Sequence, residues 1–194
     1  MAQKRAIFGG LRVLLGVSGG VAAYKAVDLA SKLTASGTFV KTVMSENACR
    51  FVGPKSFEAV TCSVVFTSLW NSSEEYKVGH LSLVDWADIV VVAPATANII
   101  GKAANGICDD LLSTVLCVCW DKPTLLAPAM NDSMWHNPAV QRNVAAVRDM
   151  GFELIGPETG RLACGAEGIG RMSEPQDILG AIREIASKIK HKKR

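Results

Sequence analysis

One short segment restricts the folds open to this chain more than any other. In residues 88–93 (DIVVVA), five apolar residues follow one aspartate. A strand that is apolar on both faces must be covered on both, as in a parallel sheet with helices on each side. Further β-rich stretches occupy residues 11–17, 39–44, 124–127 and 152–155, and helical patterns occupy residues 21–33, 97–104, 110–120, 138–150 and the segment that starts at Pro175. Alternating strands and helices indicate βαβ units, so we predict one doubly wound α/β domain, Rossmann-like or flavodoxin-like, over residues 1–194.

Composition favours a cytoplasmic protein. The 194 residues contain no apolar run of the ~20 residues that span a bilayer, and residues 1–8 lack the apolar core of a signal peptide. The net charge of +3 depends on the end of the chain: without the five Lys and Arg residues of segment 188–194 it becomes −2. We interpret this basic tail as a solvated helix end, with no nucleic-acid or membrane partner.

The six cysteines show no metal-ligand spacing, so we expect no metal site. Cys117 and Cys119 lie in an apolar run and are expected to be buried small side chains. Cys164 differs, because it lies in the polar, glycine-rich segment 156–174. That segment shows no pattern of secondary structure and also holds Arg161 and Arg171, so we interpret it as a mobile lid.

A glycine-rich turn, GVSGGV (16–21), joins the first expected strand to the first expected helix. The start of a helix offers free N–H groups to a phosphate, and glycines let a ligand approach the backbone. The spacing fits neither the dinucleotide fingerprint nor the Walker loop. We favour a mononucleotide phosphate here, with a hydroxyl from Ser45, over a tight turn without a ligand.

Two further segments follow expected strands. Small residues at Thr96 and Ala97 leave space for a flat ring beside the amide of Asn98, although Thr96 could equally be a helix cap. The segment PAMNDSMW (128–135) suits a pocket for a large planar group, although Met and Trp more often pack in a core. His80 is the best-placed candidate for a base, although a lone histidine is more often structural.

Together these segments resemble the homo-oligomeric flavin-containing cysteine decarboxylases. The resemblance runs over GVSGGVAAYKA (16–26), HLSLVDWADIVVVAPATANIIGKAANGICDDLL (80–112), PAMNDSMW (128–135) and LACGAEGIGRM (162–172). The third segment matches the family pattern Pro-x-Met-Asn-x-x-Met-Trp, and the fourth looks like the family's substrate clamp. Its cysteine is typical of the phosphopantothenoylcysteine decarboxylases of coenzyme A synthesis and is missing from the best-known decarboxylases of peptide precursors.

The resemblance implies bound FMN and decarboxylation of 4'-phospho-N-pantothenoyl-L-cysteine through a thioaldehyde and an enethiol. His80 would be the base, Asn131 would hold the carboxylate, and Cys164 would donate a proton to the enethiol. The residues implied to hold the FMN phosphate and ribityl chain are Gly19, Gly20, Val21 and Ser45, and those implied to hold its ring are Thr96, Ala97, Asn98 and Ala129. The residues implied to bind the substrate are Asn131, Met130, Arg161, Leu162 and Ala163.

The resemblance also implies a homo-oligomer, a trimer or a multiple of trimers, with the flavin at subunit contacts. Because the chain ends at Arg194, we expect the synthetase domain of fused bacterial relatives to belong to another protein. Two alternatives stay open: an oxidative decarboxylase of a C-terminal peptidyl cysteine, and a flavin-binding regulatory protein. A third, flavin prenyl transfer on a similar fold, is disfavoured by the PAMNDSMW segment.

Overall fold

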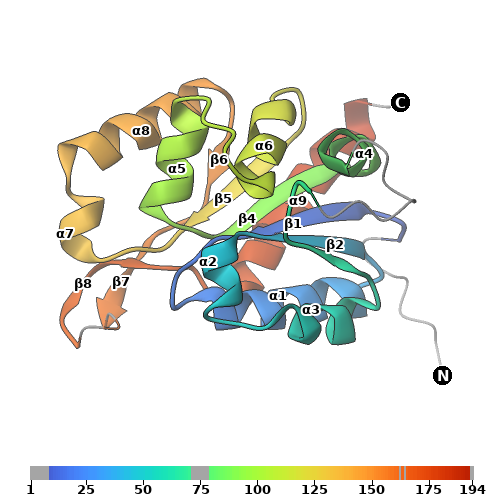
Figure 1. Ribbon diagram of the computed structural model, residues 1–194, viewed down its shortest axis with the longest axis horizontal. Coiled ribbons are helices and arrows are strands. Elements are labelled where there is room, and N and C mark those ends of the chain that lie inside the picture. Colours follow the sequence, from blue (N-terminus) through green and yellow to red (C-terminus); the bar gives the residue numbers. More distant parts are fainter. Residues whose placement is uncertain (1–8, 71–78, 162, 164, 193–194) are drawn as a thin grey trace.

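The computed structural model describes residues 9–70, 79–161, 163 and 165–192. In this part of the chain, six parallel strands form the central sheet, in the order β3-β2-β1-β4-β5-β6 (Figure 1). The strands are β1 (Arg12–Val17), β2 (Phe39–Met44), β3 (Val65–Phe66), β4 (Ile89–Ala95), β5 (Thr124–Pro128) and β6 (Glu153–Leu154). The order of the strands reverses between β1 and β4, so the predicted doubly wound fold is confirmed.

Helices cover both faces of the sheet. One face is covered by α1 (Ala23–Ala35), α3 (Pro54–Thr61) and α9 (Pro175–Lys192), and the other by α4 (Gly79–Trp86), α5 (Ala97–Ala104), α6 (Leu111–Val118) and α8 (Pro138–Asp149) (Figure 1). The short helices α2 (Glu46–Cys49) and α7 (Asp132–Trp135) follow β2 and β5. None of the helices in the described ranges is long and apolar enough to cross a membrane.

The side chains of the central strands alternate between two hydrophobic cores. Val13 and Leu15 of β1 point into the core beneath α1, α3 and α9, whereas Leu14 points into the core beneath α4, α5, α6 and α8. Every residue of β4 is buried. The segment DIVVVA (88–93), from which the parallel sheet was predicted, therefore lies in the middle of the sheet, because a strand with two apolar faces must be covered on both.

Several short elements were not anticipated from the sequence. Helices α2 and α7 have four residues each, which is too short to show a helical period, and β3 has two. Helix α3 has a proline in its first turn and a single buried side chain, Phe57. Helix α4 begins at Gly79, so His80 lies in the first turn of a helix.

The interpretation of residues 156–174 as lacking secondary structure is wrong. An antiparallel hairpin pairs β7 (Glu158–Arg161) with β8 (Glu167–Arg171). The sequence conceals these strands because they consist largely of charged residues and glycines, and because contacts from α7 support β8. Gly160 and Gly170 have φ angles of +157° and +150°, a conformation that favours glycine.

The two cysteines of the apolar run differ in exposure. Cys119 is buried as expected, and burial raises the pKa of its thiol to about 11. The expectation for Cys117 is wrong, because α6 turns that side chain toward solvent.

Phe57 provides a test of the packing of α3. Its side chain has no solvent exposure, so Phe57→Ala should lower the free energy of unfolding by about 3–5 kcal/mol in urea denaturation. Phe51 lies between α2 and α3 and is 54% exposed, so Phe51→Ala should cost less than about 1 kcal/mol. Equal losses in the two variants would mean that Phe57 does not pack in the core beneath α1, α3 and α9.

Candidate active site

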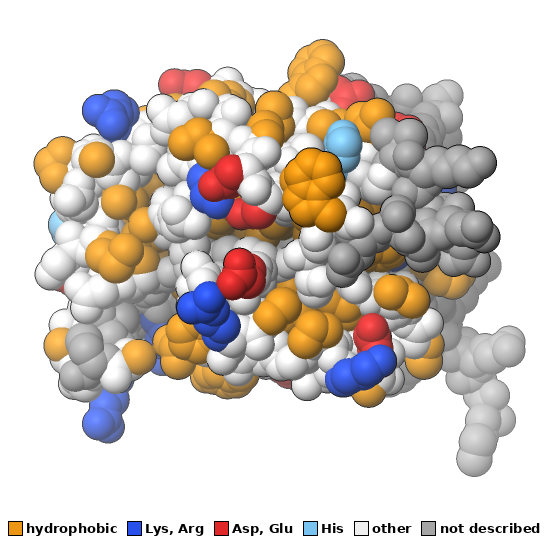
Figure 2. Space-filling model, viewed as in Figure 1, with side chains coloured by type: hydrophobic (Ala, Val, Ile, Leu, Met, Phe, Trp, Pro, Cys, Tyr) orange, Lys and Arg blue, Asp and Glu red, His pale blue; other side chains and the backbone are white. Residues whose placement is uncertain are grey.

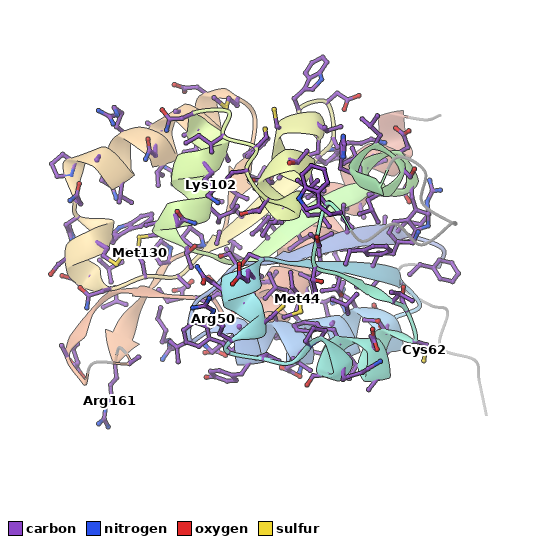
Figure 3. All side chains as sticks on the ribbon, in the orientation of Figure 1. Met44, Arg50, Cys62, Lys102, Met130 and Arg161 are labelled. Carbon is purple, nitrogen blue, oxygen red and sulfur yellow. The ribbon has the colours of Figure 1, made fainter. Side chains whose placement is uncertain are left out.

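A cavity of about 1190 Å³ lies at the carboxyl ends of β1, β2, β4 and β5, where the strand order reverses. Ligands of open α/β sheets bind at this position. Figure 3 places Lys102 on α5, Met130 after β5 and Arg50 after α2 around this end of the sheet. The cavity walls include twelve of the predicted site residues: Gly19, Gly20, Val21, Ser45, Thr96, Ala97, Asn98, Ala129, Met130, Asn131, Arg161 and Ala163.

The glycine turn approaches α2 too closely for any larger residue. A Cβ atom added at Gly19 would lie 2.4 Å from Asn47 Cβ. The first turn of α1 has Ala22 as its N-cap and no side-chain cap, so this helix start can donate backbone hydrogen bonds to a ligand. Ser45 lies beside it and caps α2 by accepting a hydrogen bond from the Ala48 N–H. These features fit a phosphate group.

Ser18 joins the glycine turn to the segment after β4. Its hydroxyl donates to the Pro94 carbonyl oxygen at 2.8 Å and accepts from the Thr96 N–H at 3.0 Å. Thr96 in turn caps α5 by accepting from the Ile99 N–H. The alternative of a helix cap at Thr96 is therefore correct, and the same residue also lines the cavity.

Asn131 is the N-cap of α7, and its side-chain oxygen accepts the Ser133 N–H at 2.9 Å. Because the oxygen is bound to the backbone, the orientation of the amide is fixed, and its NH2 group is the end that can donate to an anion. Met130 precedes it and also lines the cavity.

The hairpin supplies another wall. Ala163 and the rim residue Arg161 line the cavity, although Figure 3 shows the Arg161 side chain extending away from the body of the molecule. Leu162 and Cys164 lie outside the described residues. His80 lies on α4 and does not contribute to the described cavity walls, so a single chain does not bring its predicted base to the other site residues.

The charged wall residues that the sequence did not identify include a cluster of Lys102, Asp109 and Asp110. Lys102 Nζ lies 2.6 Å from Asp109 Oδ1 and 2.8 Å from Asp110 Oδ2, and its side chain is only 15% exposed. Burial lowers the pKa of Lys102, but the hydrogen bonds that Lys102 donates to the two carboxylates, together with their negative charge, outweigh this effect and leave the pKa raised. The hydrogen bond to Lys102 lowers the pKa of Asp109. Figure 2 shows Lys, Arg, Asp and Glu side chains gathered in the middle of the face of the molecule that is turned toward the viewer.

A sequence signal for this cluster exists. Asp109 and Asp110 come directly before an apolar helical run, which is where an acidic N-cap is expected, and Asp110 does cap α6. Nothing in the sequence indicates that Lys102, eight positions before Asp110, turns back toward that cap.

Comparison with known proteins assigns the family. Residues 3–187 match the family model described as Flavoprotein, and the chain belongs to this family. It is 48% identical over 167 residues to the coenzyme A biosynthesis bifunctional protein CoaBC of Bacillus subtilis, a match that covers 86% of this chain and 41% of the relative. The chain thus spans about two fifths of the length of that curated relative.

Two solved structures resemble the chain over nearly their whole length. A mutant PPC decarboxylase complexed with pantothenoylaminoethenethiol is 36% identical with a TM-score of 0.83, over 91% of this chain and 98% of that one. The FMN binding protein AtHal3 is 37% identical with a TM-score of 0.79, over 90% of this chain and 96% of that one.

Ser18 offers a test of the cavity wall. Ser18→Ala removes a buried hydroxyl that satisfies the Pro94 carbonyl and the Thr96 N–H, so we expect a loss of about 1–3 kcal/mol in the free energy of unfolding. Ser56→Ala, an exposed serine on α3, is the matched control and should stay within about 0.5 kcal/mol of the parent. A Ser18→Ala variant as stable as the control would show that this link is dispensable.

Proposed function

We propose that this chain is an FMN-dependent decarboxylase that converts 4'-phospho-N-pantothenoyl-L-cysteine to 4'-phosphopantetheine in coenzyme A biosynthesis. The observation that carries the proposal is the convergence of the glycine turn, the start of α5 and the Asn131 segment on one cavity, in a member of the flavoprotein family. Similarity to the PPC decarboxylase over nearly all of that chain supports the same activity.

The cavity offers a suitable place for each part of FMN. The uncapped start of α1, with Gly19, Gly20, Val21 and Ser45, would hold the phosphate and ribityl chain. Thr96, Ala97, Asn98 and Ala129, which also line the cavity, would hold the ring. When bound, FMN supplies a two-electron oxidant for the Cα–Cβ–SH unit of the substrate and a reductant for the later enethiol.

Asn131 would hold the carboxylate that leaves as carbon dioxide. Its amide oxygen accepts the Ser133 N–H, and its NH2 group would donate to the substrate carboxylate. Met130, Arg161, Leu162 and Ala163 would form the rest of the substrate site. Cys164 would give the proton that saturates the enethiol, since a thiol with a pKa of ~8.5 is mostly protonated near pH 7.

His80 would act from a neighbouring subunit. It lies on α4, and the cavity of its own chain is lined without it. A homo-oligomer in which α4 of one subunit faces the cavity of the next would supply the missing base and would exclude water from the site. The family resemblance makes a trimer, or a multiple of trimers, the assembly that we propose.

A cytoplasmic location accompanies this function. The curated relatives are coenzyme A biosynthesis proteins of bacteria, and the five described cysteines are free thiols, which suits a reducing compartment.

The decisive experiment is incubation of the FMN-loaded protein with phosphopantothenoylcysteine. We expect release of carbon dioxide and formation of the saturated aminothiol. Cys164→Ser should still release carbon dioxide but should accumulate the enethiol, because a serine hydroxyl is a much weaker acid than a thiol. Mass spectrometry distinguishes the two products by one pair of hydrogens. A parent protein that leaves this substrate unchanged but decarboxylates a C-terminal peptidyl cysteine would favour the alternative activity.

Complementation tests the source of His80. His80→Asn and Asn131→Ala should each abolish turnover as pure homo-oligomers, by roughly 10²-fold or more. Subunits of the two variants, mixed and reassembled in equal amounts, should recover about a quarter of the parent activity, because random pairing joins an intact cavity to an intact His80 at that frequency. Recovery should not occur if His80 serves the cavity of its own chain.

A further inference from the structure

The second hairpin strand lies directly against the start of α7. Two hydrogen bonds join them: the Met130 N–H donates to the Gly170 carbonyl oxygen at 2.9 Å, and the Ile169 N–H donates to Asp132 Oδ1 at 2.8 Å. Figure 1 shows α7 and β8 side by side at one end of the molecule. The second of these bonds uses a side chain, so a substitution can remove it.

Glycines in β8 make this close approach possible. A Cβ atom at Gly168 would lie 2.7 Å from Asp132 Oδ1, and one at Gly170 would lie 2.1 Å from the Met130 carbonyl oxygen. Neither distance is compatible with a larger residue. The carboxylate of Asp132 therefore contacts bare backbone, where an ionised acceptor makes a short and strong hydrogen bond.

Other contacts hold the base of the hairpin. The Ser173 hydroxyl donates to Glu158 Oε1 at 2.7 Å, and Lys25 Nζ pairs with Glu174 Oε1 at 2.8 Å. Both lie farther along the chain from the turn between the strands than Ile169 does. Among the described residues, the hydrogen bond that Asp132 accepts from Ile169 is thus the side-chain contact that holds β8 nearest to the turn, the segment whose sequence contains Cys164.

The position of Asp132 in its own helix links the hairpin to the cavity. It is the first residue of α7 and directly follows Asn131, so one short segment carries both the amide of the cavity and the carboxylate that meets the hairpin. Its other oxygen, Oδ2, lies 3.5 Å from His136 Nδ1. In the family pattern Pro-x-Met-Asn-x-x-Met-Trp, Asp132 occupies a variable position, so the pattern itself assigns it no role.

We propose that Asp132 is a positioning residue that holds the β7–β8 hairpin in register with Asn131, so that the substrate-binding residues on the hairpin meet a substrate whose carboxylate Asn131 holds. This proposal rests on the proposed function for its catalytic consequence. The contact itself does not, because the Ile169–Asp132 bond exists whatever the substrate.

The test compares Asp132→Ala, Asp132→Asn and Ser133→Ala as FMN-loaded proteins. Ser133 neighbours Asp132 on α7 and is exposed, which makes it a matched control. Amide hydrogen exchange should become roughly tenfold or more faster at Ile169 in Asp132→Ala, while the Met130 amide, which donates to the Gly170 carbonyl oxygen, keeps its protection. Asp132→Asn retains an acceptor oxygen and should restore most of the protection. Ser133→Ala should match the parent.

Steady-state kinetics test whether a loosened hairpin impairs substrate binding. In Asp132→Ala, the KM for phosphopantothenoylcysteine should rise roughly tenfold and a fraction of the product should remain unsaturated, while the rate of carbon dioxide release at saturation changes little. Unchanged exchange at Ile169 would overturn the proposal, and so would equal acceleration at Met130 and Ile169, which signals general loosening. Faster exchange with an unaltered KM and product would show that the contact does not position the substrate. A parent protein inactive on this substrate would instead overturn the proposed function, and the exchange data would still decide the contact.

Discussion

The burial of the central strands on both faces is the constraint on which the rest of this structure depends. Strand β4 exposes no residue, and β1 and β5 sit beside it in the same parallel sheet. A short turn cannot join two neighbouring parallel strands, so the chain crosses over between them through a helix that covers one face of the sheet. All the strands then end at the same edge. The glycine turn, the cap of α5 and the Asn131 segment meet there because they follow neighbouring strands, although up to about 110 residues separate them in the chain.

Close backbone approach gives this edge its shape. The turn at Gly19 touches α2, the Ser18 hydroxyl links that turn to the segment after β4, and the glycines of β8 let the hairpin lie against Met130 and Asp132. The hydrogen bonds of Ser18 and of Asp132 also give partners to backbone groups that would otherwise lack them. Close approach of backbone segments therefore shapes this edge of the sheet, which suits a site in which a bound cofactor supplies the chemistry.

The proposed site would be shared between subunits. The residues proposed to hold the cofactor and the carboxylate line the cavity of one chain, whereas the proposed base lies on a helix outside that cavity. A site completed by a neighbouring copy would couple catalysis to assembly, so that an isolated subunit would bind its ligands without turning them over. The ion cluster of Lys102, Asp109 and Asp110 fits this picture, since it fixes the wall between α5 and α6 within one chain.

Sequence alone determined the architecture, because periodicity and two-faced apolar runs are local signals that record burial directly. It also identified twelve residues of the cavity walls, since residues that follow parallel strands must meet at one edge. Tertiary structure decided the rest. The hairpin of residues 158–171 has little strand propensity of its own and depends on α7, and the partnership of Lys102 with Asp110 depends on how two helices pack. The separation of His80 from the cavity likewise follows from the direction in which α4 lies, which no local pattern encodes, because it is set by the packing of whole elements.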